Sequence, residues 1–480
     1  MYKHEKKKPE QDHRQDHERE LAGPFFAVLF LLTLVAFLLP LRPETSLRER
    51  RKLREFPQFS VQTLLSGDYF DDITAWFSDT FPGREKMLEV ADRIDSLHGL
   101  MRYEVAMTDS NTADDSAELD ALLEEAEAAA AVRPETPVTP RPEPAPADEI
   151  VDHPAEVPEE ENAEEITEEE TEDPNMEIED WTGLDGEEEM RMYGDLVVVD
   201  GVAMSRMGFE KTVSDHHAQL MNQAGDALAE QGIRFFNIPV PTSISVLLSS
   251  EMLKEMGTAD QGKTLRYMFA QENDNVYKVN AFNNLVAHNT EYLYFYSDHH
   301  WTARGAYYAY EEFCHTAGFE PVPLSEYSEL NMGKFIGSYS YSVATKLKED
   351  EMIAYVPPGN ISMEIPNYPK ATTVIVDETE ELPNAKYNCF INGDNQVTTI
   401  TNEDLPDAPD CLVIKDSFGN PFVVYLTQHY HRVIVLDYRK NFKPVTSYAE
   451  KYGVQDVILV QSIGVSQSKN AQLLLDNLMK

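Results

Sequence analysis

The sequence predicts an α/β fold with a mostly parallel sheet, helices on its faces and a transmembrane helix before it. In the second half of the chain, short apolar strands alternate with helix-like segments, an order typical of parallel sheets. Polar residues that can do chemistry follow the ends of two of these strands, where active sites of such sheets lie. Near the N-terminus, an apolar run of roughly twenty residues is long enough to cross a bilayer.

The apolar run is Leu21–Leu41, which we interpret as a single membrane-spanning helix after a cytoplasmic tail, residues 1–20. A cleaved signal peptide is the competing interpretation. The run is long for a signal peptide and no small-x-small cleavage site follows it, so we expect an uncleaved anchor. Lys and Arg number six before the run and six between Arg42 and Arg54, so the positive-inside rule does not set the orientation.

An acidic segment, residues 109–190, separates two parts of the chain. It holds 31 acidic and 2 basic residues, which accounts for −29 of the net charge of −45. High charge with few aromatic residues predicts disorder, although Ala117–Val132 is rich in helix formers and should be locally helical. Two interpretations are open: a spacer or cation-binding tether, or an unselective solvated loop. Residues 50–108, before the segment, should be helical and pack on the main domain with their aromatic side chains.

Composition limits the class of binding partner, the roles that the cysteines can have and the cofactors to be expected. No basic patch exists beyond the first sixty residues, which argues against nucleic acid as a partner. The three cysteines lie in apolar surroundings without CxxC or metal-type spacing, so we expect small core residues. They are Cys314, Cys389 and Cys411. No P-loop or Rossmann glycine pattern is present, so no cofactor is expected.

The main domain, residues 191–480, alternates between strand and helix patterns. The expected strands are Ile233–Pro239, Tyr292–Tyr296, Cys411–Ile414, Arg432–Leu436 and Asp456–Val460, after a strand–turn–strand hairpin at Asp195–Val202. The expected helices are Ser214–Gln231, Leu248–Met256, Gly262–Gln271 and Thr302–Thr316. Residues 320–410 are expected to be irregular, with turns at Pro357-Pro358-Gly359 and Asn392-Gly393.

One stretch, EYLYFYSDHHWTARGAYYAY at Glu291–Tyr310, combines an apolar run with Asp298 and His300 directly after it. Side chains of a strand repeat every two residues, so these two should share one face while His299 points the other way. A carboxylate and an imidazole at a strand end make the acid–base half of a Ser-His-Asp triad. The nucleophile should lie at another strand end, and Ser417 in CLVIKDSFGN is the best candidate.

In this interpretation His300 removes the hydroxyl proton of Ser417, and Asp298 holds the imidazole in the required tautomer. Backbone N–H groups beside the serine can stabilise a developing oxyanion. Taken alone, Ser417 is more typical of a helix N-cap than of a nucleophile, and the Asp-His pair is more typical of a capped strand end with a satisfied histidine. A second SDHH, at Ser214–His217, opens an amphipathic helix and follows no apolar strand, so we interpret Ser214 or Asp215 as its N-cap. No metal site is expected, because neighbouring strand residues point to opposite faces.

The stretches TEYLYFYSDHHWTARGAYYAY and LVIKDSFGNPFVVYLTQHYHRVIVLDYR together resemble the DHHW family of bacterial envelope proteins. That family is similar in turn to the SGNH-hydrolase-like domain of the alginate O-acetylation proteins. The resemblance extends to SGDYFDDITAWFSDTFPGREKM and to GSYSYSV at residues 337–343, and leaves the acidic segment as an insertion. It implies an SGNH-hydrolase-like three-layer fold with the triad Asp298, His300 and Ser417. The serine motif reads KDSF instead of GDS, and Gly337 and Asn420 are the candidates for the oxyanion hole.

The resemblance implies acyl-ester chemistry on a cell-surface polysaccharide, either O-acetyl transfer to sugar hydroxyls or hydrolysis of such esters. The expected partners are the membrane, the polysaccharide and a membrane-bound O-acyltransferase that supplies acetyl groups. The expected location is the cell membrane, single-pass, with the main domain extracytoplasmic. The alternative is a non-catalytic polysaccharide-binding or assembly protein that keeps the hydrolase fold, which an incomplete oxyanion hole would favour.

Overall fold

The computed structural model describes residues 190–366, 368–376, 386–441 and 443–479, the helix α5 (Ser116–Ala131), and scattered positions among residues 45–80 and 183–184. The chain divides into two compact units, Met1–Leu100 and Met101–Lys480. In the first unit, β1 (Thr45–Ser46) pairs antiparallel with β2 (Arg51–Lys52). The expected transmembrane helix lies outside the described residues, and no helix within them is long and apolar enough to cross a membrane.

The second unit is built on a seven-stranded sheet in the order β10-β11-β13-β12-β14-β6-β7. In that order the strands are Ile361–Glu364, Val397–Asn402, Arg432–Asp437, Cys411–Lys415, Asp456–Ser462, Arg234–Val240 and Val276–Lys278. All neighbours from β13 to β7 pair in parallel, whereas β11 runs antiparallel to both of its neighbours. The prediction of a mostly parallel sheet is therefore confirmed, in a mixed sheet with one reversed strand.

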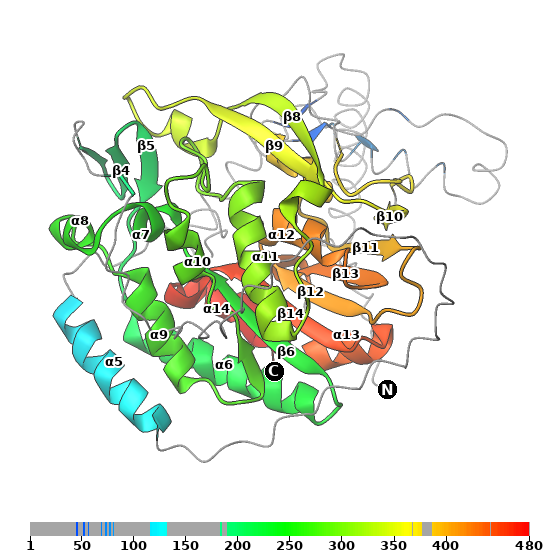
Figure 1. Ribbon diagram of the computed structural model, residues 1–480, viewed down its shortest axis with the longest axis horizontal. Coiled ribbons are helices and arrows are strands. Elements are labelled where there is room, and N and C mark those ends of the chain that lie inside the picture. The colour runs from blue at the N-terminus through cyan, green and yellow to red at the C-terminus, as the bar shows by residue number, and fades with distance from the viewer. Residues whose placement is uncertain are drawn as a thin grey trace, which may run out of the picture. The chain divides into compact units, whose positions relative to one another are not determined.

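Both faces of this sheet are covered by helices, which gives three layers (Figure 1). Along β12 the side chains alternate: Cys411 and Val413 enter one apolar core, while Leu412 and Ile414 enter the other. The first core is closed by α7 (Ser243–Leu247), α10 (Phe282–Ala287), α11 (Ala303–Ala317) and α12 (Gly419–Leu426). The second is closed by α6 (Lys211–Ala229), α13 (Val445–Tyr452) and α14 (Lys469–Met479). Strands that are buried on both faces have continuous apolar runs in their sequence. These runs are the signal by which the parallel strands were predicted.

Two smaller antiparallel sheets lie outside the main one. The first is β3-β4-β5 (Arg191–Tyr193, Leu196–Val199 and Val202–Ser205), and the second is the pair β8 (Ser328–Phe335) and β9 (Asp350–Val356). The predicted hairpin is confirmed, with Asp200 and Gly201 at φ 50° and 74° in the turn. The expectation of an irregular region at 320–410 is wrong, since β8, β9, β10 and β11 all fall in it. These strands were missed because turns and long connecting segments separate each of them from its pairing partner in the sequence.

The predicted helices are present, with shifted ends in places. Thr302 caps α11 by accepting from the Gly305 N–H, and Gly318 ends it with a left-handed φ of 75°. Helix α6 begins earlier than expected, after Glu210, so the N-cap prediction for Ser214 or Asp215 is wrong. The Ser214 hydroxyl instead accepts from the Gln467 side chain inside the protein. Two further predicted helices are present as α8 (Ser250–Glu255) and α9 (Gln261–Gln271). All three cysteines are buried and free, as predicted.

Part of the acidic segment is folded. The expected local helix is confirmed as α5, which lies along α9 (Figure 1). Leu119 and Leu123 are buried there together with Phe209 and Tyr267. At the helix surface, Asp120 pairs with Lys263 of α9 at 2.6 Å, and Glu127 pairs with Arg266. An apolar stripe and its flanking charges thus join this helix to the domain, while most of the remaining acidic segment lies outside the described residues.

A buried acid beside β6 should make the stability of the domain pH-dependent. Burial raises the pKa of Glu272 to about 8, against the weaker opposing influences of Lys278 and a hydrogen bond from Asn237. The folded chain therefore keeps a proton that the unfolded chain releases between about pH 4.5 and 8. We expect this side chain to lower stability by up to about 1.4 kcal/mol per pH unit as pH rises through that window.

Glu272→Gln should flatten this pH dependence, because glutamine keeps the acceptor for Asn237 and does not titrate. The measurement is urea unfolding at several pH values between 5 and 8. Glu255→Gln, at an exposed position of α8, is the matched control and should follow the wild type. Parallel stability curves for Glu272→Gln and the wild type would show that Glu272 is not protonated in the folded chain.

Candidate functional site

The segment that carries Asp298 and His300 is a tight loop and not the strand expected at Tyr292–Tyr296. Only one isolated antiparallel bridge forms, between Tyr294 and Trp301, and the Thr302 N–H closes the loop on the Leu293 carbonyl at 2.8 Å. Tyr294 and Phe295 are nevertheless buried in the first apolar core, and the half-buried Tyr292 and Tyr296 pack against it. An apolar run predicts burial more securely than it predicts strand conformation, which explains the error.

A buried carboxylate accepts the backbone hydrogen bonds of this segment that a neighbouring strand would otherwise accept. Asp350, the first residue of β9 and 1% exposed, accepts from the N–H groups of Tyr296 at 2.7 Å and Ser297 at 2.8 Å. It also accepts from the Tyr292 hydroxyl at 2.6 Å and from the Ser297 hydroxyl. Four donors on one buried carboxylate fix the residues immediately before Asp298. Nothing in the sequence distinguished Asp350, because its partners lie more than fifty residues earlier.

The loop brings together the three residues that the sequence singled out. His300 Nδ1 lies 2.6 Å from Asp298 Oδ1, and His300 Nε2 lies 2.7 Å from Ser417 Oγ. Asp298 is fully buried and His300 nearly so, while Ser417 is partly exposed at the end of β12. With the Nδ1 proton donated to Asp298, Nε2 is the nitrogen that can accept the proton of the Ser417 hydroxyl.

The second oxygen of Asp298 is held by the next loop. Asp298 Oδ2 accepts from the Ser338 N–H at 2.8 Å and from the Ser338 hydroxyl at 3.0 Å. Just before it, the Gly337 N–H donates to Ser297 Oγ at 2.9 Å, and a Cβ at Gly337 would lie 2.2 Å from the Ser297 carbonyl oxygen. Gly337 is thus needed for close backbone packing. The oxyanion role expected of Gly337 is not supported, because its N–H is already donated to Ser297.

The turn that carries Ser417 is fixed from both sides. Asp416 accepts from the Phe418 N–H with one oxygen and from the Ser462 N–H at the end of β14 with the other, both at 2.9 Å. The Trp301 indole N–H donates to the Phe418 carbonyl at 2.9 Å. The tryptophan that ends the SDHHW motif therefore binds the loop of the expected nucleophile directly.

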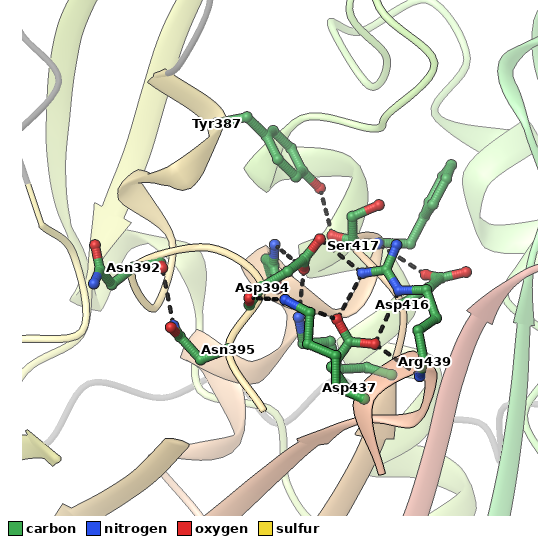
Figure 2. A network of polar contacts seen from close by, with 12 residues as sticks. Tyr387, Asn392, Asp394, Asn395, Asp416, Ser417, Asp437 and Arg439 are labelled. Atoms are coloured by element: carbon green, nitrogen blue, oxygen red, sulfur yellow. Dashed lines mark hydrogen bonds and ion pairs between the residues drawn. The ribbon is translucent and has the colours of Figure 1, made fainter. Parts of the chain in front are cut away.

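A network of charges lies next to the Ser417 turn (Figure 2). Asp394 accepts from Lys415 at 2.6 Å and from Arg439 at 2.7 Å, and Arg439 also pairs with Asp437. Burial alone would raise the pKa of Asp394, but the charges of Lys415 and Arg439 hold that pKa well below its usual range. The Asn420 side-chain amide also donates to Asp394, at 3.1 Å, and Asn420 is only 1% exposed. Asn420 thus belongs to this network, and the oxyanion role expected of it is not supported.

Tyr387 contacts two of the three residues, and no sequence pattern had indicated it. Its ring stacks on the His300 imidazole with centroids 3.9 Å apart and planes 17° apart. Its hydroxyl donates to the Ser417 carbonyl at 3.1 Å (Figure 2). Tyr387 therefore holds the imidazole and the serine backbone at once. It lies in the region expected to be irregular, outside any recognisable motif.

His299 does not point away from the site, contrary to the expectation from strand geometry. Its ring lies 3.8 Å from that of His300, and its Nδ1 lies 3.4 Å from Asp298 Oδ1. The possible ligand atoms of Asp298, His299 and His300 all lie within 4.8 Å of one another, so the geometric argument against a metal fails. For these residues to share an ion, however, His300 would have to give up its hydrogen bond to Asp298. The absence of a metal thus stays a prediction.

Removing the acceptor capacity of Asp350 should loosen the loop. Asp350→Asn replaces one carboxylate oxygen by a donor that faces N–H groups, and we expect the free energy of unfolding to fall by about 1–3 kcal/mol. Chemical denaturation at pH 7 measures this. Glu351→Gln, a change at the adjacent exposed residue, is the control and should be nearly neutral. Equal stability of the two variants would contradict the role given to Asp350.

Comparison with known proteins supplies the context for this geometry. Among solved structures, a DHHW family protein from Eubacterium siraeum is similar with a TM-score of 0.53 and 21% identity, over 61% of this chain and 98% of that one. Bacillus cereus PatB1 with a sulfonyl adduct gives a TM-score of 0.49 and 19% identity, over 58% of this chain and 97% of that one.

The O-acetyltransferase domain of Pseudomonas putida AlgJ gives a TM-score of 0.36 and 14% identity, over 58% of this chain and 99% of that one. At these identities the similarity concerns the fold alone. A comparison with curated protein sequences finds no match. The DHHW protein family, in contrast, matches residues 49–436, which is most of the chain. This protein is a member of the DHHW family.

Proposed function

We propose that this protein is an acyl-ester enzyme that transfers acetyl groups to hydroxyls of a cell-surface polysaccharide, or hydrolyses such esters when water is the acceptor. The observation that carries the proposal is the unbroken series of short hydrogen bonds from Asp298 through His300 to Ser417. A buried carboxylate, an imidazole and a partly exposed hydroxyl in this order are the arrangement that activates a serine nucleophile. The similarity of the DHHW family to the alginate O-acetylation proteins supports acetyl as the group transferred.

The reaction would proceed in two half-reactions. Ser417 Oγ attacks the carbonyl carbon of the acetyl donor while its proton moves to His300 Nε2, and the donor's leaving group departs with that proton. The acetyl-Ser417 ester is then attacked by a sugar hydroxyl or by water, whose proton again passes to Nε2, and Ser417 Oγ leaves as the hydroxyl. Asp298 stabilises the charged imidazolium in each half-reaction without taking its proton.

The developing oxyanion needs a donor, and the backbone at the turn limits the choice. The Phe418 and Gly419 N–H groups both donate to Asp416, to its side chain and its carbonyl respectively. The Asn420 N–H donates to the Ser417 carbonyl. Within the described part of the chain, the Ser417 N–H has no acceptor, so it is the donor we assign to the oxyanion.

The location is part of the proposal and rests on the family resemblance, because the charges around the apolar run do not set its orientation. An uncleaved helix at Leu21–Leu41 would hold the domain on the outer face of the cell membrane, where the polysaccharide lies. A membrane-bound O-acyltransferase would supply acetyl groups from the other side. No cofactor is required for this chemistry, because the acyl group is carried by Ser417 itself.

A specific observation also favours the alternative, a non-catalytic polysaccharide-binding or assembly protein. The N–H of Gly337 and the side-chain amide of Asn420 are donated to Ser297 and Asp394, so neither residue completes an oxyanion hole. A site with a single backbone donor stabilises the tetrahedral intermediate less than one with several, by about 2.7–4 kcal/mol for each missing donor. Activity measurements separate the two functions.

Ser417→Ala should lower the rate of acetate release from an acetylated chromogenic ester by a factor of about 10³ or more, because the variant cannot form the acyl intermediate. The comparison uses wild type, Ser417→Ala and Ser342→Ala, a serine exposed in the 337–343 loop, which should keep full activity. Adding an acceptor oligosaccharide and following its acetylation distinguishes transferase from esterase. Equal background rates in wild type and Ser417→Ala, with both folded, would leave the non-catalytic function.

A further inference from the structure

A cavity of about 300 Å³ lies beside the triad and is not used by the chemistry described above. It is lined by residues that follow the carboxyl ends of two adjacent strands: Thr242 and Ser243 after β6, and Gln467 and Asn470 after β14. Binding sites of parallel sheets lie at this edge. The volume is at the small end of the range for ligand pockets, so it suits a small unit of a ligand and not a long segment of one.

The cavity reaches the triad through His299. The His299 side chain is part of its lining and contacts the His300 ring, with centroids 3.8 Å apart and planes tilted by 38°. Tyr339, also in the lining, follows directly after Ser338, the residue that holds the second oxygen of Asp298. Ser417 itself does not line the cavity. A ligand in the cavity would therefore lie next to the reacting group and not on it.

The lining is rich in hydroxyl and amide groups and so suits a sugar better than an acyl chain. Besides Thr242, Gln467 and Asn470 it includes the basic side chains of Arg206 and Lys469 and apolar surface from Met207. Arg206 donates with its two terminal nitrogens to backbone carbonyls, of Met256 at 3.1 Å and Gly194 at 3.2 Å.

The Arg206 Nε atom is buried and has no hydrogen-bond partner among the described residues. Lys469, at the first position of α14, is exposed and has no ion-pair partner in the same part of the chain. The Lys469 ammonium is thus the charged group that can bind a ligand in the cavity, beside a polar wall and some apolar surface. Carbohydrates, which present many hydroxyls around an apolar ring face, match this combination.

We propose that this cavity is an acceptor subsite that binds the sugar unit next to the one whose hydroxyl reacts at Ser417. The inference that the bound sugar is an acetyl acceptor rests on the proposed function. The binding of sugar in the cavity does not depend on catalysis. It implies that the substrate is a chain: an oligosaccharide can occupy the subsite and the reaction position together, whereas a monosaccharide cannot. Affinity should therefore rise with acceptor length.

The test places a bulky side chain in the cavity at one of its lining residues. Asn470→Trp introduces a large ring at a lining position, and Leu473→Trp introduces the same ring on the same helix at a position that is 63% exposed. Calorimetry with the full-length chain measures binding of two probes, a tetrasaccharide of N-acetylglucosamine and a tetrasaccharide of uronic acid. We expect at least one probe to bind, Asn470→Trp to weaken that binding tenfold or more, and Leu473→Trp to leave it unchanged.

A second readout separates the subsite from the reaction. In Asn470→Trp the KM for the oligosaccharide acceptor should rise tenfold or more, whereas Leu473→Trp should keep both this KM and the rate of chromogenic acetate hydrolysis without acceptor within twofold of wild type. Failure of both probes to bind, or binding that Asn470→Trp does not change, would overturn the subsite. Probe binding that Asn470→Trp weakens, in a protein with no Ser417 chemistry, would uphold sugar binding and reject the proposed enzyme.

Discussion

The site depends on one contact between distant parts of the chain, the hydrogen bond from the Trp301 indole to the Phe418 carbonyl. It joins the loop that carries Asp298 and His300 to the turn that carries Ser417, 117 residues later. Each partner is also fixed on its own side: Asp350 holds the first loop, and Asp416 holds the second through Ser462. A buried indole and buried carboxylates give geometric precision because leaving any of their partners unpaired would cost free energy.

The sheet explains why the site forms where it does. From β12 the chain passes to β13 on one side, and after β13 it crosses to β14 on the other side of β12. Connections that diverge from adjacent strands leave a crevice above their carboxyl ends. Ser417 lies at the end of β12, Ser462 at the end of β14, and the proposed sugar subsite follows β14 and β6. The reacting group and its acceptor would thus share one edge of one sheet.

How far the sequence could predict this site is clear from particular residues. Ser417 follows the strand β12, as strand patterning predicted. Asp298 and His300 were identified by the motif after an apolar run, although Tyr292–Tyr296 is not a strand. Strand geometry wrongly predicted that His299 points away from the site, since its ring lies against that of His300. Asp350 and Tyr387 were missed, since their partners are remote in sequence and neither lies in a recognisable motif. Gly337 and Asn420 were placed near the site correctly but given a role that their hydrogen bonds do not support.

The most direct test of the account is covalent trapping of Ser417 with a sulfonyl fluoride, followed by peptide mass spectrometry. The account predicts one modified residue, Ser417, in the wild-type protein and in a His299→Gln variant, because His299 takes no proton in the proposed reaction. It predicts at least a hundredfold slower labelling in His300→Ala, where the base is missing. No labelling of the folded wild-type protein, or equal labelling rates without His300, would contradict the assignment of Asp298, His300 and Ser417 as an activated triad.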